Sequence, residues 1–166
     1  MSKPMIVLLI LLGLFIVAQF VRPPLNVATG SPTDAIVPKF PVPMTIQALL
    51  RRSCYDCHSN NTVYPWYSYV EPAGWLQASH IKDGKHALNF DEFMSYPAAK
   101  QYHRFGDIRE QIEEGNMPLS SYTLIHRYAI LSPEEKESLI QWTENMRDTM
   151  RNWYPIDSLQ HAHRPR

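Results

Sequence analysis

The chain has 166 residues, and its 16 Lys and Arg balance 16 Asp and Glu, so its formal net charge is zero. A neutral chain gives no sign of nucleic-acid binding. Its length allows one modest core beside any terminal segments.

The N-terminal residues 5–21 are almost wholly apolar and follow Lys3. Such a segment is either a signal peptide or a membrane anchor. No clear small-residue cleavage site follows, since Val-Ala-Gln-Phe at 17–20 fits poorly. We therefore expect residues 1–22 to be an uncleaved signal anchor, single-pass in the cytoplasmic membrane, with the rest of the chain on the periplasmic side. A cleaved signal that releases the chain to the periplasm stays open.

The next segment, residues 23–43, contains six prolines and predicts an extended linker. Its later half could instead wrap the domain as ordered coil. We expect a single domain over residues 44–154 and a flexible tail over residues 155–166, which carries His161 and His163.

The periodicity of the domain is helical, and no stretch alternates convincingly as a strand. Helices are expected to begin, in chain order, at Thr45, Glu71-Pro72, Asn89 (with Glu92 as its capping box), Pro97 and Ser132. Asp83-Gly84 is expected to end the second helix, and Gly115 the fourth. The sequence therefore predicts an all-α fold of short helices and long loops.

The run Cys54-Tyr55-Asp56-Cys57-His58 contains the only two cysteines of the chain. Two cysteines at this spacing, followed by histidine, are typical of c-type haem attachment: each thiol bonds to a vinyl group, and the histidine binds the iron. A thioredoxin-like dithiol is the first alternative, although no strand–helix alternation surrounds the motif. A four-thiolate zinc site lacks its second cysteine pair, but a site completed by other histidines stays open.

Met117, in Glu114-Gly115-Asn116-Met117-Pro118, is the best candidate for the sixth iron ligand. Proline after it favours an extended backbone, which can direct the thioether out of the loop. Met/His ligation raises the reduction potential and suits electron transfer. The rival ligands are the histidines His80, His86, His103 and His126, each of which would lower the potential.

Two further features flank the haem motif. The aromatic run over residues 64–75 would pack against a porphyrin, with Trp66 or Tyr67 close to it. Arg51 and Arg52 could pair with haem propionates, or serve as exposed charge.

Residues 54–67, Cys-Tyr-Asp-Cys-His-Ser-Asn-Asn-Thr-x-Tyr-Pro-Trp-Tyr, resemble the small exported haem-binding domain family, which belongs with class I cytochrome c-like proteins. Further segments that resemble it are 88–90, 113–118, 121–126 and 131–142. Asn116 stands where that family would lead us to expect an acidic residue. The resemblance implies a cytochrome c-like bundle around one haem c, covalently attached through Cys54 and Cys57, with axial ligands at His58 and Met117.

The function expected from these features is a membrane-tethered monohaem c-type cytochrome that carries single electrons between periplasmic redox partners, rather than an enzyme. A haem-based sensor, in which Met117 is absent from the iron or displaceable, is the first alternative. A peroxidase-type enzyme that uses His126, and a thiol oxidoreductase that uses Cys54 and Cys57, are the others.

Overall fold

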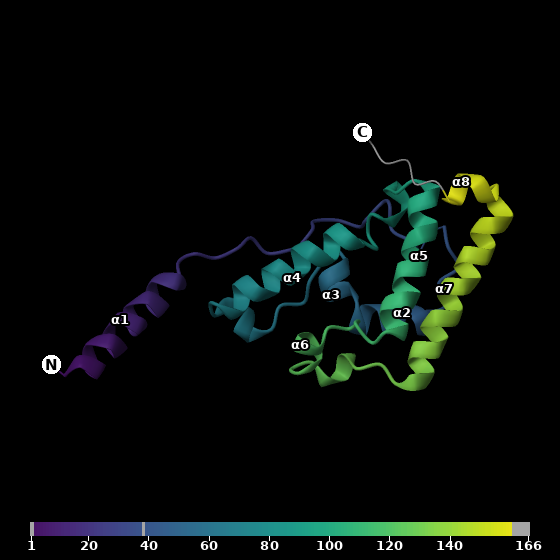
Figure 1. The fold of residues 1–166 in the computed structure, drawn as a ribbon. Coiled ribbons are helices and arrows are strands. Elements are labelled where there is room, and N and C mark those ends of the chain that lie inside the picture. The colour runs from purple at the N-terminus through teal and green to yellow at the C-terminus, as the bar shows by residue number, and fades with distance from the viewer. Residues whose placement is uncertain (1, 38, 161–166) are drawn as a thin grey trace.

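The computed structural model describes residues 2–37 and 39–160. In these ranges the chain forms helices joined by loops, with one isolated bridge between Val27 and Asn61 (Figure 1). The all-α prediction is confirmed: 64% of the described residues are helical, and none of them lies in a strand. The α-helices are α1 (Lys3–Ala18), α2 (Met44–Ser53), α3 (Tyr55–His58), α4 (Ala73–Ala87), α5 (Ala98–Glu113), α6 (Ser120–Thr123), α7 (Pro133–Trp153) and α8 (Ile156–Gln160). Three short 3₁₀ helices lie between them, η1 (Trp66–Tyr69), η2 (Phe93–Ser95) and η3 (Arg127–Ala129).

Helix α7 begins where the sequence predicts. The Ser132 hydroxyl accepts a hydrogen bond from the Glu135 N–H at 3.2 Å, and the Glu135 carboxylate accepts one from the Ser132 N–H at 2.9 Å. This reciprocal pair satisfies two N–H groups that have no partner within the helix. The predicted end of α5 is also confirmed, because Gly115 follows it with φ +72°.

Helices α5 and α7 lie side by side and cover the main core (Figure 1). Phe105 of α5 is fully buried and makes edge-on ring contacts with Phe40 at 5.2 Å and Trp142 at 5.6 Å. Such clustered aromatic rings bury large apolar areas and dominate the energy of a small core.

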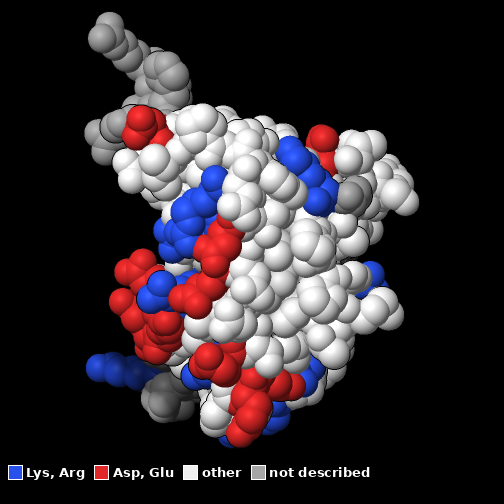
Figure 2. Space-filling view, turned by 90° about the vertical axis from the view of Figure 1, so that its right-hand side faces the viewer, with Lys and Arg blue, Asp and Glu red and all other residues white. Residues whose placement is uncertain are grey.

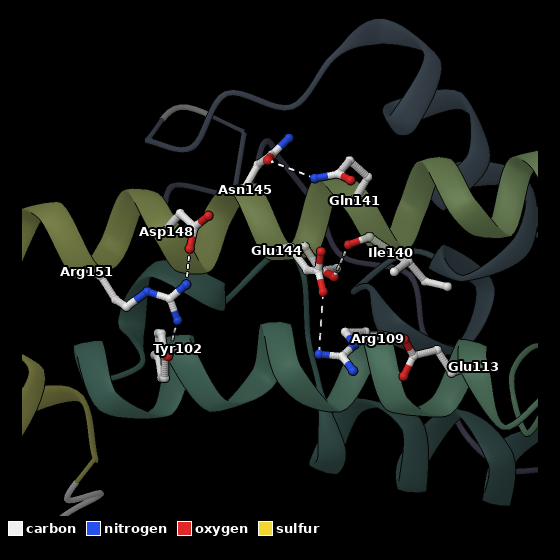
Figure 3. Close-up of polar contacts among 10 residues, drawn as sticks. Tyr102, Arg109, Glu113, Ile140, Gln141, Glu144, Asn145, Asp148 and Arg151 are labelled. Atoms are coloured by element: carbon white, nitrogen blue, oxygen red, sulfur yellow. Dashed lines mark hydrogen bonds and ion pairs between the residues drawn. The ribbon is translucent and has the colours of Figure 1, made fainter.

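Polar contacts cross the rim of the same helix pair (Figure 3). Arg109 of α5 reaches Glu144 of α7 at 3.5 Å, and Arg151 of α7 donates to the Tyr102 hydroxyl at 2.9 Å. Figure 2 shows acidic and basic side chains interspersed mainly on the left of the view, next to a broad area without charged residues. Exposed pairs of this kind each contribute little, so the buried rings hold the helices together.

The proline-rich segment 23–43 packs against the helices. Ile36, Phe40 and Val42 lie in the core with exposed fractions of 0%, 2% and 8%. Nearer the N-terminus, the Asn26 side-chain amide donates to the Ser59 carbonyl at 2.9 Å, next to the haem motif. Residues 33–37 and 39–43, in the later half of the segment, are ordered coil in this structure, whereas the boundary of the domain at residue 44 stays a prediction.

Helix α1 corrects the expected localisation. It spans 16 residues, roughly 24 Å at 1.5 Å per residue, against a hydrocarbon core of about 30 Å. No helix in the described ranges is both long enough and apolar enough to cross a membrane. The predicted single-pass anchor over residues 5–21 is therefore wrong. The physical reason is that the helix ends at Ala18, before Arg22, Pro23 and Pro24.

Two local predictions differ from the structure. Thr45 lies inside α2, and Pro43 occupies the N-cap position. No side chain caps this helix, because the proline side chain has no hydrogen-bond acceptor. Asn89 and Glu92 form no capping box. Instead, the Asn89 side chain accepts from the Asp91 N–H at 3.1 Å and donates to Asn60 at 2.8 Å.

The C-terminal end of the described chain forms α8, and its Leu159 is fully buried. Residues 161–166, with His161 and His163 of the expected tail, lie outside the described residues.

Candidate functional site

Two cavities of about 400 Å³ each adjoin the haem motif. Four residues line both of them: Cys54, His58, Ala87 and Met117. The first cavity extends between α4 and α6, and its wall includes Cys57, His80, Gly84, Leu119 and Tyr122. The second extends along α5, and its wall includes Phe90, Arg104, Ile108, Gln111 and Ile112. The shared residues mark the junction of the two cavities.

His58 ends the short helix α3 and is fixed by one ring nitrogen. Its Nδ1 lies 3.0 Å from the Leu88 carbonyl oxygen. Because a carbonyl only accepts, Nδ1 carries the proton and Nε2 keeps its lone pair free. Burial lowers the pKa of His58, an effect that its backbone hydrogen bonds only partly offset. The ring is therefore held neutral, which is the form that binds a metal.

The two cysteines are free thiols in this structure and both line the first cavity. Burial raises the pKa of Cys54 to about 12, and the neighbouring Cys57 adds to the rise. Burial likewise raises the pKa of Cys57 to about 11, with Asp56 as a second cause. Dithiol enzymes depend on a lowered thiol pKa. The local environment therefore disfavours the thiol oxidoreductase alternative.

Met117 reaches the junction on the loop that follows α5. Gly115 takes up the left-handed backbone that reverses the chain, with φ +72°. The backbone N–H groups of Asn116 and Met117 then both donate to the Gln111 carbonyl, at 3.0 and 3.1 Å. These bonds tie the loop to the end of α5, so Met117 is held against both cavities by backbone contacts.

The chain that forms these cavities is similar to a known protein family. The model of the haem-binding domain family matches residues 13–145, most of the chain. The chain belongs to the haem-binding domain family. No curated protein and no solved structure gave a match. The family description supports binding of haem.

The cavities of this haem-binding domain fit the group that the family implies. Cofactor sites typically enclose about 300–1,000 Å³ between apolar walls with a few placed polar groups. Each cavity falls in that range, and Phe90, Ile108 and Ile112 supply apolar wall on the α5 side. Thiol, imidazole and thioether groups stand together at the junction, which is a donor set suited to haem iron.

The rival iron ligands are arranged differently from Met117. His86 and His103 are exposed, and neither lines the cavities. His80 lines the first cavity and a smaller neighbouring one, but not the second. Within the part of the chain that the structure describes, no three His, Cys, Asp or Glu side chains form a cluster that could hold a metal ion. The zinc alternative therefore has no support here.

His126 has other partners. Its exposed fraction is 8%, its Nδ1 donates to the Tyr122 carbonyl at 3.1 Å, and its Nε2 lies 2.8 Å from the Tyr67 hydroxyl. With Nδ1 as the donor, Nε2 accepts from Tyr67. The Tyr122 ring stacks on the imidazole at 4.0 Å, and its hydroxyl donates to Asp56 at 2.6 Å. His126 thus belongs to a polar network beside the haem motif, as a hydrogen-bonded structural residue.

Of the residues expected beside the haem from the sequence, only some lie near the cavities. Trp66 is 79% exposed and lines neither cavity, while Tyr67 lines the smaller cavity next to the first. Arg52 pairs with Glu135 at 2.6 Å, and Arg51 is exposed away from both cavities. The two arginines before the motif are therefore not placed as propionate partners.

Gly84 is a site residue that sequence reasoning misses. It was expected to end a helix, yet α4 continues through it to Ala87. A Cβ at this position would lie 2.7 Å from the Cys57 carbonyl oxygen, so only glycine permits the close approach of α4 to the haem motif. A glycine in a helical pattern can mark either a helix end or such a contact, and the sequence alone does not distinguish them.

Proposed function

We propose that this haem-binding domain carries one haem c, bonded to Cys54 and Cys57 and ligated by His58 and Met117, and transfers single electrons between redox partner proteins. The observation that carries the proposal is the junction of the two cavities. Both proposed ligands and the first cysteine line both cavities, so all three stand where one flat group would fill the two together.

Backbone groups of the chain hold both proposed ligands in position. The Leu88 carbonyl fixes the tautomer and the orientation of His58. The Gln111 carbonyl holds the loop that presents Met117. Haem supplies an iron that gains or loses one electron, and ligation by histidine and methionine favours the reduced form. A protein ligand on each side suits electron transfer, since it leaves no open position for a substrate.

An electron carrier is favoured over a peroxidase by the state of His126. A peroxidase needs an acid–base group beside an open iron position. Both ring nitrogens of His126 are already hydrogen-bonded, and the residue lines neither of the two cavities that share His58 and Met117. The candidate acid–base residue is therefore committed to the network with Tyr67 and Tyr122.

The test is an absorption spectrum of the full chain made in a host with c-type maturation, in the oxidised and the reduced state, followed by extraction with acidic solvent. We expect colour that stays with the protein, low-spin bands and a methionine–iron charge-transfer band. Retained haem with a high-spin spectrum would favour a sensor or a peroxidase. Extractable haem or a colourless protein would refute covalent attachment.

Alkylation of the same protein provides an independent check on the cysteines. Thioether-bonded Cys54 and Cys57 will not react with iodoacetamide even after unfolding in urea. The haem-free chain from a host without c-type maturation is the control, and both thiols should react once it is unfolded. Reaction of both thiols in the coloured protein would show that the haem is held without covalent bonds.

A further inference from the structure

The two propionates of a haem are carboxylates and need hydrogen-bond donors or positive charges, whereas the opposite edge of the haem is apolar. They lie on the porphyrin edge opposite the two vinyl groups, which would bond to the cysteines in the proposed site. Both cysteines line the first cavity, whereas only Cys54 lines the second. The second cavity, along α5, is therefore the side with room for the carboxylate edge.

Arg104 lies in the wall of this second cavity. Its Nη1 pairs with the Asp107 carboxylate at 2.6 Å. Its Nε is buried and has no hydrogen-bond partner among the described residues. A buried donor of a charged group that makes no hydrogen bond lowers the stability of the fold, and such donors are rare in native proteins. The guanidinium carries five N–H donors, and the edge formed by Nε and Nη2 matches the two oxygens of a carboxylate.

Other charges around the cavities favour Arg104 as the propionate partner. Among the described residues that line either large cavity, Arg104 is the one Lys or Arg. The nearby Arg109 is on the same helix but pairs with Glu113 and Glu144. The second cavity also has Asp107 and Glu110 in its wall, so two carboxylates face the single guanidinium. An anionic group can enter this side only if Arg104 receives it.

We propose that Arg104 binds a haem propionate through its Nε–Nη2 edge, while Asp107 holds the guanidinium in place through Nη1. This inference rests on the proposed function and names the residue that receives the charged edge of the cofactor. Arg51 and Arg52, which precede the haem motif in the sequence, do not take this role, because neither lines either cavity.

The experiment measures the reduction potential of the haem-loaded full chain at neutral pH for wild type, Arg104→Gln, Arg104→Lys and Arg109→Gln. A positive charge beside the haem disfavours the oxidised iron, so its loss in Arg104→Gln should lower the potential. Arg109→Gln removes the same charge from the same helix, outside the cavity wall, and should shift the potential much less. Arg104→Lys keeps the charge without the two-donor edge, so its potential should stay nearer to that of wild type.

Resonance Raman spectra report the propionate contact separately from the charge. The propionate bending band should shift in both Arg104 variants and not in Arg109→Gln. An unchanged band and potential in Arg104→Gln, with the haem still covalently attached, would overturn the inference and leave the proposed function intact. If Arg104→Gln does not fold, Arg104→Lys decides by the band alone. A wild-type chain without covalent haem would overturn both proposals.

Discussion

Gly84 of α4 and Cys57 of the haem motif are in direct backbone contact, so close that a Cβ at Gly84 would also lie 3.1 Å from the Cys57 Cβ. Helix α4 therefore sets the position of the second thiol. The residue that follows its last turn is Leu88, whose carbonyl orients His58. One helix thus positions both the second cysteine of the motif and the imidazole that we propose as an iron ligand.

Gly84→Ala should impair the site, against the usual effect of alanine in a helix. Alanine normally stabilises a helix interior by about 0.5–1 kcal/mol relative to glycine. Here the new methyl group meets backbone atoms that cannot move away freely. We expect lower stability and less covalent haem per chain, measured by urea unfolding and by haem absorbance relative to protein.

The control for Gly84→Ala is Gly106→Ala in α5. The nearest atoms to a Cβ at Gly106 belong to the Arg147 side chain, at 3.6 Å or more, which is an ordinary contact. This variant should gain stability by about 0.5–1 kcal/mol. Equal behaviour of the two variants would show that the contact with Cys57 imposes no constraint.

Met117→Ala should change the iron spectrum and leave the haem attached. Loss of the thioether removes the ligand that favours reduced iron, so the charge-transfer band should disappear and the reduction potential should fall. Met44→Ala is the matched control, because Met44 is 82% exposed and lines neither cavity. An unchanged low-spin spectrum in Met117→Ala would exclude methionine ligation.

Tyr122→Phe should destabilise the fold through Asp56. The Tyr122 hydroxyl donates to one Asp56 carboxylate oxygen, and the other oxygen accepts from the Val63 N–H at 3.1 Å. Burial, followed by the hydrogen bond to Asp56, raises the pKa of Tyr122, so the hydroxyl stays protonated and able to donate. A hydrogen bond to a charged group contributes about 1.5–3 kcal/mol, and urea unfolding should show a loss of this order.

Tyr69→Phe provides the comparison for Tyr122→Phe. Tyr69 is 43% exposed, and Tyr69→Phe removes only its hydroxyl. Its removal should change the free energy of unfolding by less than about 0.5 kcal/mol. A loss in Tyr122→Phe no greater than in Tyr69→Phe would mean that Asp56 does not depend on this donor.

The start of α7 should give a pH-dependent contribution to stability. The hydrogen bond from Arg52, then that from the Ser132 backbone, lowers the pKa of Glu135 from its ordinary 4.5. Because the pKa is lower in the folded state, the contribution is present above the unfolded-state value and is lost as the pH falls through the folded one. Glu135→Gln should therefore be less stable than wild type at pH 7, with a difference that shrinks below about pH 4.5.

The readout for Glu135→Gln is urea unfolding at pH 7 and pH 3. Glutamine can still accept from the Ser132 N–H, so the variant tests the charge and not the cap itself. Glu137→Gln, on an exposed part of the same helix, controls for a general change in net charge. A difference that persists at pH 3 would assign the effect to packing.

The sequence predicts those parts of the fold that depend on local signals. Ser132 and Gly115 are correctly placed at helix ends, because capping and left-handed backbone are properties of short segments. The same local rule fails at Gly84, where the glycine serves a contact with Cys57, which is 27 positions away. Sequence reasoning succeeds at Ser132 and Gly115 and fails at Gly84, because only folding brings Cys57 next to Gly84.

The site divides in the same way. The spacing of Cys54, Cys57 and His58 is a local pattern and identifies the motif directly. The placement of Arg104 depends on how α5 packs across the motif, and no pattern around it in the sequence distinguishes it from Arg51 or Arg52. Asp56 likewise looks like a variable position within the motif until the fold brings Tyr122 to it.

The packing of residues 23–43 decides where this protein can be shortened. A fragment that starts at residue 44, as composition alone would suggest, lacks Ile36, Phe40 and Val42 from its interior. Large-to-small changes at a single buried site of this kind already cost about 2–5 kcal/mol, a large part of the stability of a small domain. The smallest piece expected to fold and accept haem begins ahead of Asn26, whose side chain closes over the loop beside His58.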